Sequence, residues 1–118
     1  MKLMTKPIKT KLEKNWTEVV AKYEAGDSDI NETIVCKLFN PCGAATWLLT
    51  QLDPDDGDIM YGLADLGFGC VEYGSISLSE LQALKLPMGL TIERDLHFDP
   101  KGRKVSDFLS LTTLCGIS

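Results

Sequence analysis

Long apolar segments are missing from this chain of 118 residues. The longest stretch without Asp, Glu, Lys or Arg covers residues 38–52, which is too short and too polar to cross a bilayer. The lysine-rich start is not followed by the apolar stretch and small-residue cleavage site of a secretory signal. We therefore expect a cytoplasmic protein without a membrane partner.

Cysteine pairs are missing as well. The four cysteines stand apart with no C-x-x-C spacing: Cys36, Cys42, Cys70 and Cys115. This pattern argues against a zinc site or a disulfide framework and favours reduced, buried thiols. There is also no G-x-S-x-G motif and no glycine-rich phosphate loop, since Gly67-Phe68-Gly69 is too short and is typical of a turn. We predict no catalytic residue and no cofactor.

Basic residues are absent between Lys37 and Lys85, and the whole chain has a formal net charge of −5. The same span holds seven acidic residues: Asp53, Asp55, Asp56, Asp58, Asp65, Glu72 and Glu80. An acidic body repels nucleic-acid phosphates and favours a basic protein surface, although acidic surfaces also keep ordinary proteins soluble.

The N-terminal segment carries the opposite charge. Residues 1–22 hold only Glu13 and Glu18 against six lysines: Lys2, Lys6, Lys9, Lys11, Lys14 and Lys22. This basic segment could contact nucleic acid even where the acidic body could not.

Two helical patterns occur in this segment. Thr5 and Pro7 are typical of a helix start, and apolar residues then recur at spacings of four. Asn15 and Glu18 resemble a capping box, followed by an apolar stripe that would end at Gly26. Whether the two stretches form one helix is left open.

Short β-favouring runs bounded by turn residues follow. They predict strands over residues 33–39, 45–52, 59–65 and 70–76, and a fifth over 91–98. Ser77 and Glu80 form a capping box for a short helix from 78 to about 85, stopped by Pro87 and Gly89. A short C-terminal helix would carry Phe108, Leu111, Thr112 and Cys115.

These elements predict an α+β fold. We expect a single domain over residues 1–118, with a mainly antiparallel sheet of about five strands and helices on one face. The hydrophobic fraction of 44% is sufficient for one compact core.

Two polar runs contain side chains that metal sites use. The run from Asp53 to Asp58 resembles a calcium loop, but its glycine and final ligand are out of register, so we interpret it as a hairpin tip. Glu93, Asp95 and His97 alternate on one face of the last strand and could bind a divalent metal or act as an acid–base set.

Buried or aromatic side chains give further candidates. Arg94 shares its strand face with apolar residues and needs a partner, for which Glu72 is the candidate in a structural ion pair. Trp16, Tyr23 and Trp47 could stack on bases, but their spacing favours packing in the core.

Residues 3–99 contain several short motifs that together resemble the bacterial domain of unknown function 2958 family. They are Leu3-Met4-Thr5, Lys37-Leu38-Phe39-Asn40-Pro41, Thr46-Trp47, Tyr61-Gly62-Leu63, Glu72-Tyr73-Gly74, Ser77-Leu78-Ser79-Glu80-Leu81, Gly89-Leu90 and Glu93-Arg94-Asp95. Four residues after the tryptophan, the family usually has glutamate, whereas this chain has Gln51. The resemblance implies no established activity, but it does imply a plasmid, integrative-element or phage context, often near anti-restriction or DNA-transfer genes.

Three functions follow as expectations. The first is a non-catalytic, acidic binding protein that blocks or recruits a basic host or transfer-machinery protein through Asp53, Asp55, Asp56, Asp58 and Asp65. The second is a nucleic-acid accessory protein that docks through Lys2, Lys6, Lys9, Lys11 and Lys14. The third is a metal-dependent enzyme centred on Glu93, Asp95 and His97.

Overall fold

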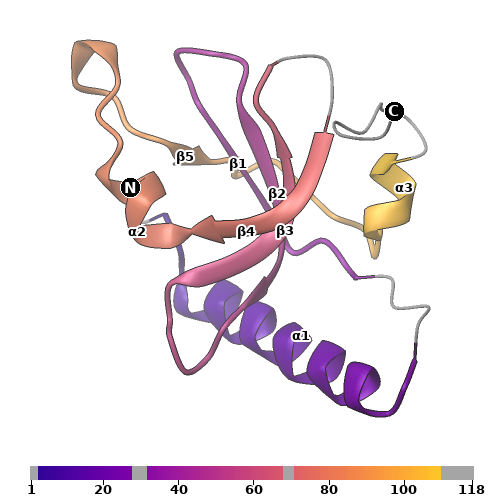
Figure 1. Cartoon of the computed structure of the whole chain (residues 1–118). Helices are drawn as coiled ribbons and strands as arrows, with labels where there is room; N and C mark the ends of the chain where they lie inside the picture. The colour runs from indigo at the N-terminus through magenta and orange to yellow at the C-terminus, as the bar shows by residue number, and fades with distance from the viewer. Residues whose placement is uncertain (1–2, 28–31, 68–70, 110–118) are drawn as a thin grey trace.

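The computed structural model describes residues 3–27, 32–67 and 71–109 (Figure 1). Its elements are α1 (Lys6–Glu24), β1 (Cys36–Phe39), β2 (Thr46–Leu52), β3 (Ile59–Asp65), β4 (Val71–Ser77), α2 (Leu78–Ala83), the 3-10 turn η1 (Pro87–Gly89), β5 (Glu93–Arg94) and α3 (Val105–Leu109). Within those ranges, no helix has the length and apolar character needed to cross a membrane.

The N-terminal pattern forms one helix, α1. The Thr5 hydroxyl accepts a hydrogen bond from the Ile8 amide at 3.4 Å, so Thr5 is the N-cap, and Pro7 lies in the first turn as predicted. The interpretation of Asn15 as a second cap is wrong, because Asn15 lies in the interior of α1. Gly26 follows the helix with φ of +80°, a conformation that glycine adopts without strain.

The strands form one antiparallel sheet in the order β4-β3-β2-β1-β5, which confirms the predicted meander. The fifth strand is the main difference, since β5 contains only Glu93 and Arg94. Directly after it, the Asp95 carboxylate accepts the His97 amide at 2.9 Å. This local side-chain bond favours a turn over continued strand pairing, which is why the strand expected over residues 91–98 stops early.

The hydrophobic core lies between α1 and one face of the sheet. Leu12 of α1 is fully buried among strand residues that include Leu38, Leu49 and Met60. The expectation that all helices cover this face is wrong. Phe108 of α3 lies beside Leu48, and neighbouring strand residues such as Leu48 and Leu49 point to opposite faces.

The short helix α2 begins as its capping box predicted. The Ser77 hydroxyl accepts the Glu80 amide at 3.3 Å, which defines Ser77 as the N-cap. The helix ends at Ala83, two residues earlier than expected. In Figure 1, α2 directly continues β4, so the start of α2 lies beside the end of the sheet where β3 begins.

The cysteines were expected to be buried. Cys36 is buried in the core, and this burial raises the pKa of its thiol to about 12. Cys42 is exposed in the β1–β2 turn, so the prediction is wrong for this residue. Cys70 and Cys115 lie outside the described residues, as do Lys2, Phe68, Leu111 and Thr112.

Candidate functional site

The acidic hairpin, which we define as Asp53 to Asp58, connects β2 to β3. Asp53 Oδ1 accepts the backbone amide of Asp55 at 2.9 Å, and Asp56 Oδ1 accepts the amide of Asp58 at 2.8 Å. These bonds are typical of tight turns that begin with aspartate. They fix two carboxylates at the hairpin tip, while Asp55 between them is exposed.

Asp58 connects the acidic hairpin to α2. Its carboxylate accepts the Ser77 hydroxyl at 2.7 Å and the Ser79 amide at 2.7 Å. The hydrogen bond from Ser77, followed by those from Ser79, holds the pKa of Asp58 below its ordinary value. Asp58 is therefore charged and positioned across the whole neutral range.

Asp65 was predicted to act together with this hairpin, but the structure does not bring them together. Asp65 lies at the far end of β3, where its carboxylate accepts the Gly67 amide at 3.0 Å. The candidate acidic site therefore contains Asp53, Asp55, Asp56 and Asp58, without Asp65.

The lysines of α1 lie on a helix of mixed charge. Lys6, Lys11 and Lys14 are exposed and Lys9 is half-buried, but Glu13 and Glu18 occur on the same helix. Lys2 is outside the described residues. The helix therefore offers separate basic side chains for nucleic-acid contact, interrupted by carboxylates.

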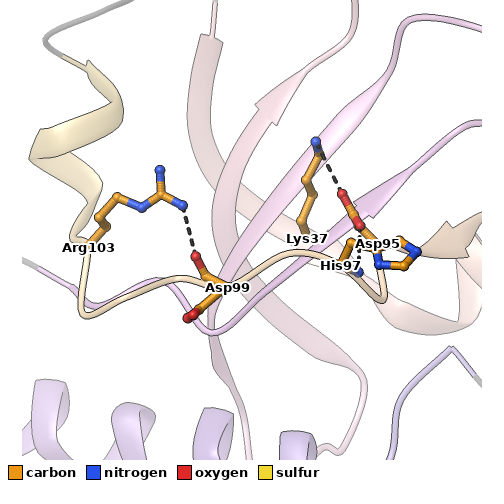
Figure 2. A network of polar contacts seen from close by, with 5 residues as sticks. All are labelled: Lys37, Asp95, His97, Asp99 and Arg103. Carbon is orange, nitrogen blue, oxygen red and sulfur yellow. Dashed lines mark hydrogen bonds and ion pairs between the residues drawn. The ribbon is translucent and has the colours of Figure 1, made fainter.

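Of the candidate metal-ligating residues Glu93, Asp95 and His97, the structure engages the Asp95 carboxylate in other contacts. Figure 2 shows the Asp95 carboxylate directed toward the Lys37 ammonium, at an N–O distance of 3.6 Å. The other Asp95 oxygen accepts the His97 amide. In the part of the chain that the structure describes, no group of three or more His, Cys, Asp or Glu side chains could hold a metal ion.

The predicted ion pair between Arg94 and Glu72 is also wrong. Arg94 lies on β5 and Glu72 on β4, and these strands form opposite edges of the sheet. The Arg94 guanidinium instead donates to the Leu3 carbonyl oxygen at 2.7 Å. The arginine thus connects the start of the chain to the last strand.

A second polar site, missed from the sequence, surrounds the carboxylate of Glu32. The Thr50 hydroxyl lies 2.6 Å from Glu32 Oε1, and the Gln51 amide nitrogen donates to the same oxygen. The Tyr73 hydroxyl donates to Glu32 Oε2 and accepts from Gln51 at 3.2 Å. We call these four residues the Glu32 cluster.

The β-bulge in β2 gives this cluster its shape. The β2–β3 register shifts between Leu49 and Gln51, so that Thr50 is the extra residue. The Thr50 carbonyl oxygen accepts a hydrogen bond from the Asn15 side-chain amide at 2.9 Å. Asn15, interpreted as a cap, therefore connects α1 to the bulge.

An aromatic row runs beside the Glu32 cluster. The ring centroids of Trp16 and Tyr61 are 5.6 Å apart, and those of Tyr61 and Tyr73 are 6.3 Å apart in a stacked arrangement. Core packing is confirmed for Trp47, which is buried, and is wrong for Tyr23, which is 77% exposed. Tyr73 is 42% exposed, so the row reaches the surface.

The other end of this sheet face has an apolar cavity of about 190 Å³. Leu48, Leu63, Val71 and Phe108 line it, together with Thr46 and the carboxylate-bearing Asp65. Its lining is predominantly hydrophobic, in contrast to the Glu32 cluster.

The sequence of this chain matches one known protein family. A family model described as a protein of unknown function (DUF2958) matches residues 3–117. The chain belongs to this family. The resemblance expected from the short motifs is therefore confirmed over nearly the whole chain. No curated protein and no solved structure gave a significant match.

Some residues of the missed site were visible in the motifs that resemble DUF2958, and others were not. Tyr61 and Tyr73 each belong to one of these motifs, and Gln51 follows the Thr46-Trp47 motif. Cross-strand pairing places Gln51 opposite Tyr61. Glu32 could not be found in this way, because it precedes β1 and reaches Tyr73 across 41 positions of sequence.

Tyr73→Phe is expected to destabilise this DUF2958 protein by about 2 kcal/mol at neutral pH, because Glu32 would lose a hydrogen-bond donor. Burial, followed by the hydrogen bond to Glu32, raises the pKa of Tyr73 above its ordinary value of 10.0. A raised pKa stabilises the folded state below pH 10.0, and this contribution is lost as the pH rises beyond that value. The difference in stability between wild type and variant should therefore shrink in strong base.

Urea unfolding followed at a series of pH values measures this difference. Tyr23→Phe is the matched control, because Tyr23 is largely exposed and its substitution should change stability little. Equal effects of the two substitutions at neutral pH would contradict the assigned contact.

Proposed function

We propose that this protein is a small, non-catalytic binding protein of a mobile genetic element, which occupies a basic, nucleic-acid-binding surface of a host or DNA-transfer protein. It would act as an inhibitor of the anti-restriction or anti-CRISPR type. The observation that carries this proposal is the acidic hairpin, which projects negative charge from a span without any lysine or arginine between Lys37 and Lys85.

The geometry of the hairpin supports this role. Its turn bonds hold the Asp53 and Asp56 carboxylates in place, and Asp58 is fixed against the start of α2. Because these charges are positioned before binding, association loses less side-chain freedom than it would with mobile carboxylates. Fixed charges of one sign also accelerate encounter with a partner of opposite sign.

The test removes hairpin charge while preserving its hydrogen bonds. In a triple variant with Asp53, Asp55 and Asp56 each changed to Asn, the side-chain oxygens still accept the turn amides, but three charges are lost. The tagged wild-type protein is used to capture partners from its host, and association rates with the purified partner are then measured. The variant is expected to associate at least about tenfold more slowly at low salt.

A control variant removes the same charge elsewhere. Glu18, Glu24 and Glu72 are exposed and lie outside the hairpin, so changing all three to Gln matches the net charge of the test variant. Equal association of wild type and hairpin variant would contradict the proposal. So would capture of a partner whose binding surface is not basic.

The exposed lysines of α1 favour one alternative, a nucleic-acid accessory protein. Lys6, Lys11 and Lys14 could neutralise phosphates, and binding would then weaken steeply with salt. A gel-shift series with DNA and RNA distinguishes the two functions. Retention at low salt that is lost in a triple lysine-to-glutamine variant would support this alternative.

A further inference from the structure

Within the described part of the chain, the side-chain partners of the Glu32 carboxylate are neutral groups. These partners are the Thr50 hydroxyl, the Gln51 side-chain amide and the Tyr73 hydroxyl. Throughout the described ranges, no lysine or arginine forms an ion pair with Glu32. A half-buried carboxylate without a cation is costly, so a cation supplied from outside would stabilise it.

The same site presents an aromatic surface. The Tyr73 hydroxyl is engaged by Glu32 and Gln51, yet 42% of the residue is exposed. Tyr61 supports Tyr73 by stacking, and Trp16 in turn contacts Tyr61. The row therefore holds the exposed tyrosine in a fixed orientation beside the carboxylate.

We propose that Glu32 and Tyr73 form a receptor for one arginine side chain of the basic partner. A guanidinium group can lie over a tyrosine ring and donate hydrogen bonds to a carboxylate at the ring edge. Arginine fits better than lysine, because its planar and weakly hydrated group can do both at once. This inference rests on the proposed function and specifies which side chain of the partner is recognised.

The receptor lies close enough to the acidic hairpin for one partner to contact both. Tyr61 lies three positions after Asp58 and pairs with Gln51, which stands two positions before Asp53. The receptor and the acidic hairpin therefore occupy the same end of the β2–β3 pair. In this arrangement, the hairpin attracts basic surfaces in general and the receptor selects for arginine.

The test compares fluorescent oligo-arginine and oligo-lysine peptides of equal length by anisotropy at low salt. Wild-type protein is expected to bind the arginine peptide about tenfold more tightly than the lysine peptide. Glu32→Gln is expected to abolish this preference by lowering only the arginine affinity. The hairpin triple variant described above should weaken both peptides and retain the preference.

The outcomes separate the two proposals. If wild type binds both peptides equally and the hairpin variant weakens both, the arginine receptor is overturned and the proposed function stands. If wild type binds neither peptide, both are overturned. An arginine preference that persists in Glu32→Gln also overturns the receptor.

A second measurement does not depend on the folding of a variant. Nuclear magnetic resonance of wild type, titrated with N-acetyl-arginine amide, should shift the Gln51 side-chain amide and the Tyr73 ring signals. The lysine analogue should shift them much less. Equal shifts with both analogues, or shifts at neither residue, would overturn the receptor.

Discussion

Gly62→Ala is expected to reduce the free energy of unfolding by about 4 kcal/mol, one of the largest effects of a single methyl group in this protein. A Cβ atom at this position would collide with the carbonyl oxygen of Leu48 and would lie 3.0 Å from both the Leu48 carbonyl carbon and the Leu49 Cα. These are backbone atoms of the neighbouring strand, so no side-chain rotation relieves the contact. The β2–β3 pair would have to separate next to the bulge.

Gly74→Ala is the matched control. Gly74 lies on β4 and pairs directly with Gly62 of β3, but a Cβ atom at Gly74 would meet nothing within 4 Å. Alanine should change stability by less than about 1 kcal/mol there, in the stabilising direction, because it restricts the unfolded chain. Urea unfolding of the two variants measures the difference, and similar stabilities would show that the close approach at Gly62 is absent.

Gln51→Glu is expected to destabilise the protein by about 3 kcal/mol at pH 7, the second large effect. The Gln51 amide now donates to the Glu32 carboxylate. Glutamate would replace this donor with a second carboxylate, and two negative charges would face each other in a largely buried position. The resemblance to DUF2958 makes the substitution informative, since that family usually has glutamate here.

The double variant Glu32→Gln/Gln51→Glu tests the cause. It exchanges the amide and the carboxylate, and because Gln51 already lies 3.2 Å from the Tyr73 hydroxyl, the new carboxylate can still accept that donor. Most of the stability should return. Lowering the pH should also rescue the single variant, because protonating one of the two carboxylates removes the repulsion. A double variant as unstable as the single one would contradict the arrangement of the Glu32 cluster.

The sheet could be predicted well because its signals are local. The strands from 46 to 77 are short runs of β-favouring residues that are joined by turns rich in Asp, Pro and Gly. The predicted length of the fifth strand was wrong, and the reason is also local. Its sequence alternates correctly, but the side chain of Asp95 captures a backbone amide and starts a turn.

The candidate site could be predicted only in part. The acidic hairpin was visible, because its carboxylates are adjacent in sequence and occur in a turn. The Glu32 cluster was not, because tertiary packing brings together a loop residue, a bulge and a distant strand. The role of Asn15 could not be predicted for the same reason. Its spacing to Glu18 fits a helix cap, whereas its side chain binds the carbonyl oxygen of Thr50, 35 positions away.

The bond from Arg94 to the Leu3 carbonyl has a consequence for biosynthesis. During synthesis, α1 and the first four strands emerge from the ribosome before β5 does, so β1 has an open hydrogen-bonding edge during that interval. The later pairing of β5 with β1 closes this edge, and the Arg94 guanidinium then binds the Leu3 carbonyl oxygen. The nascent protein is therefore most vulnerable to aggregation between the emergence of β4 and that of β5.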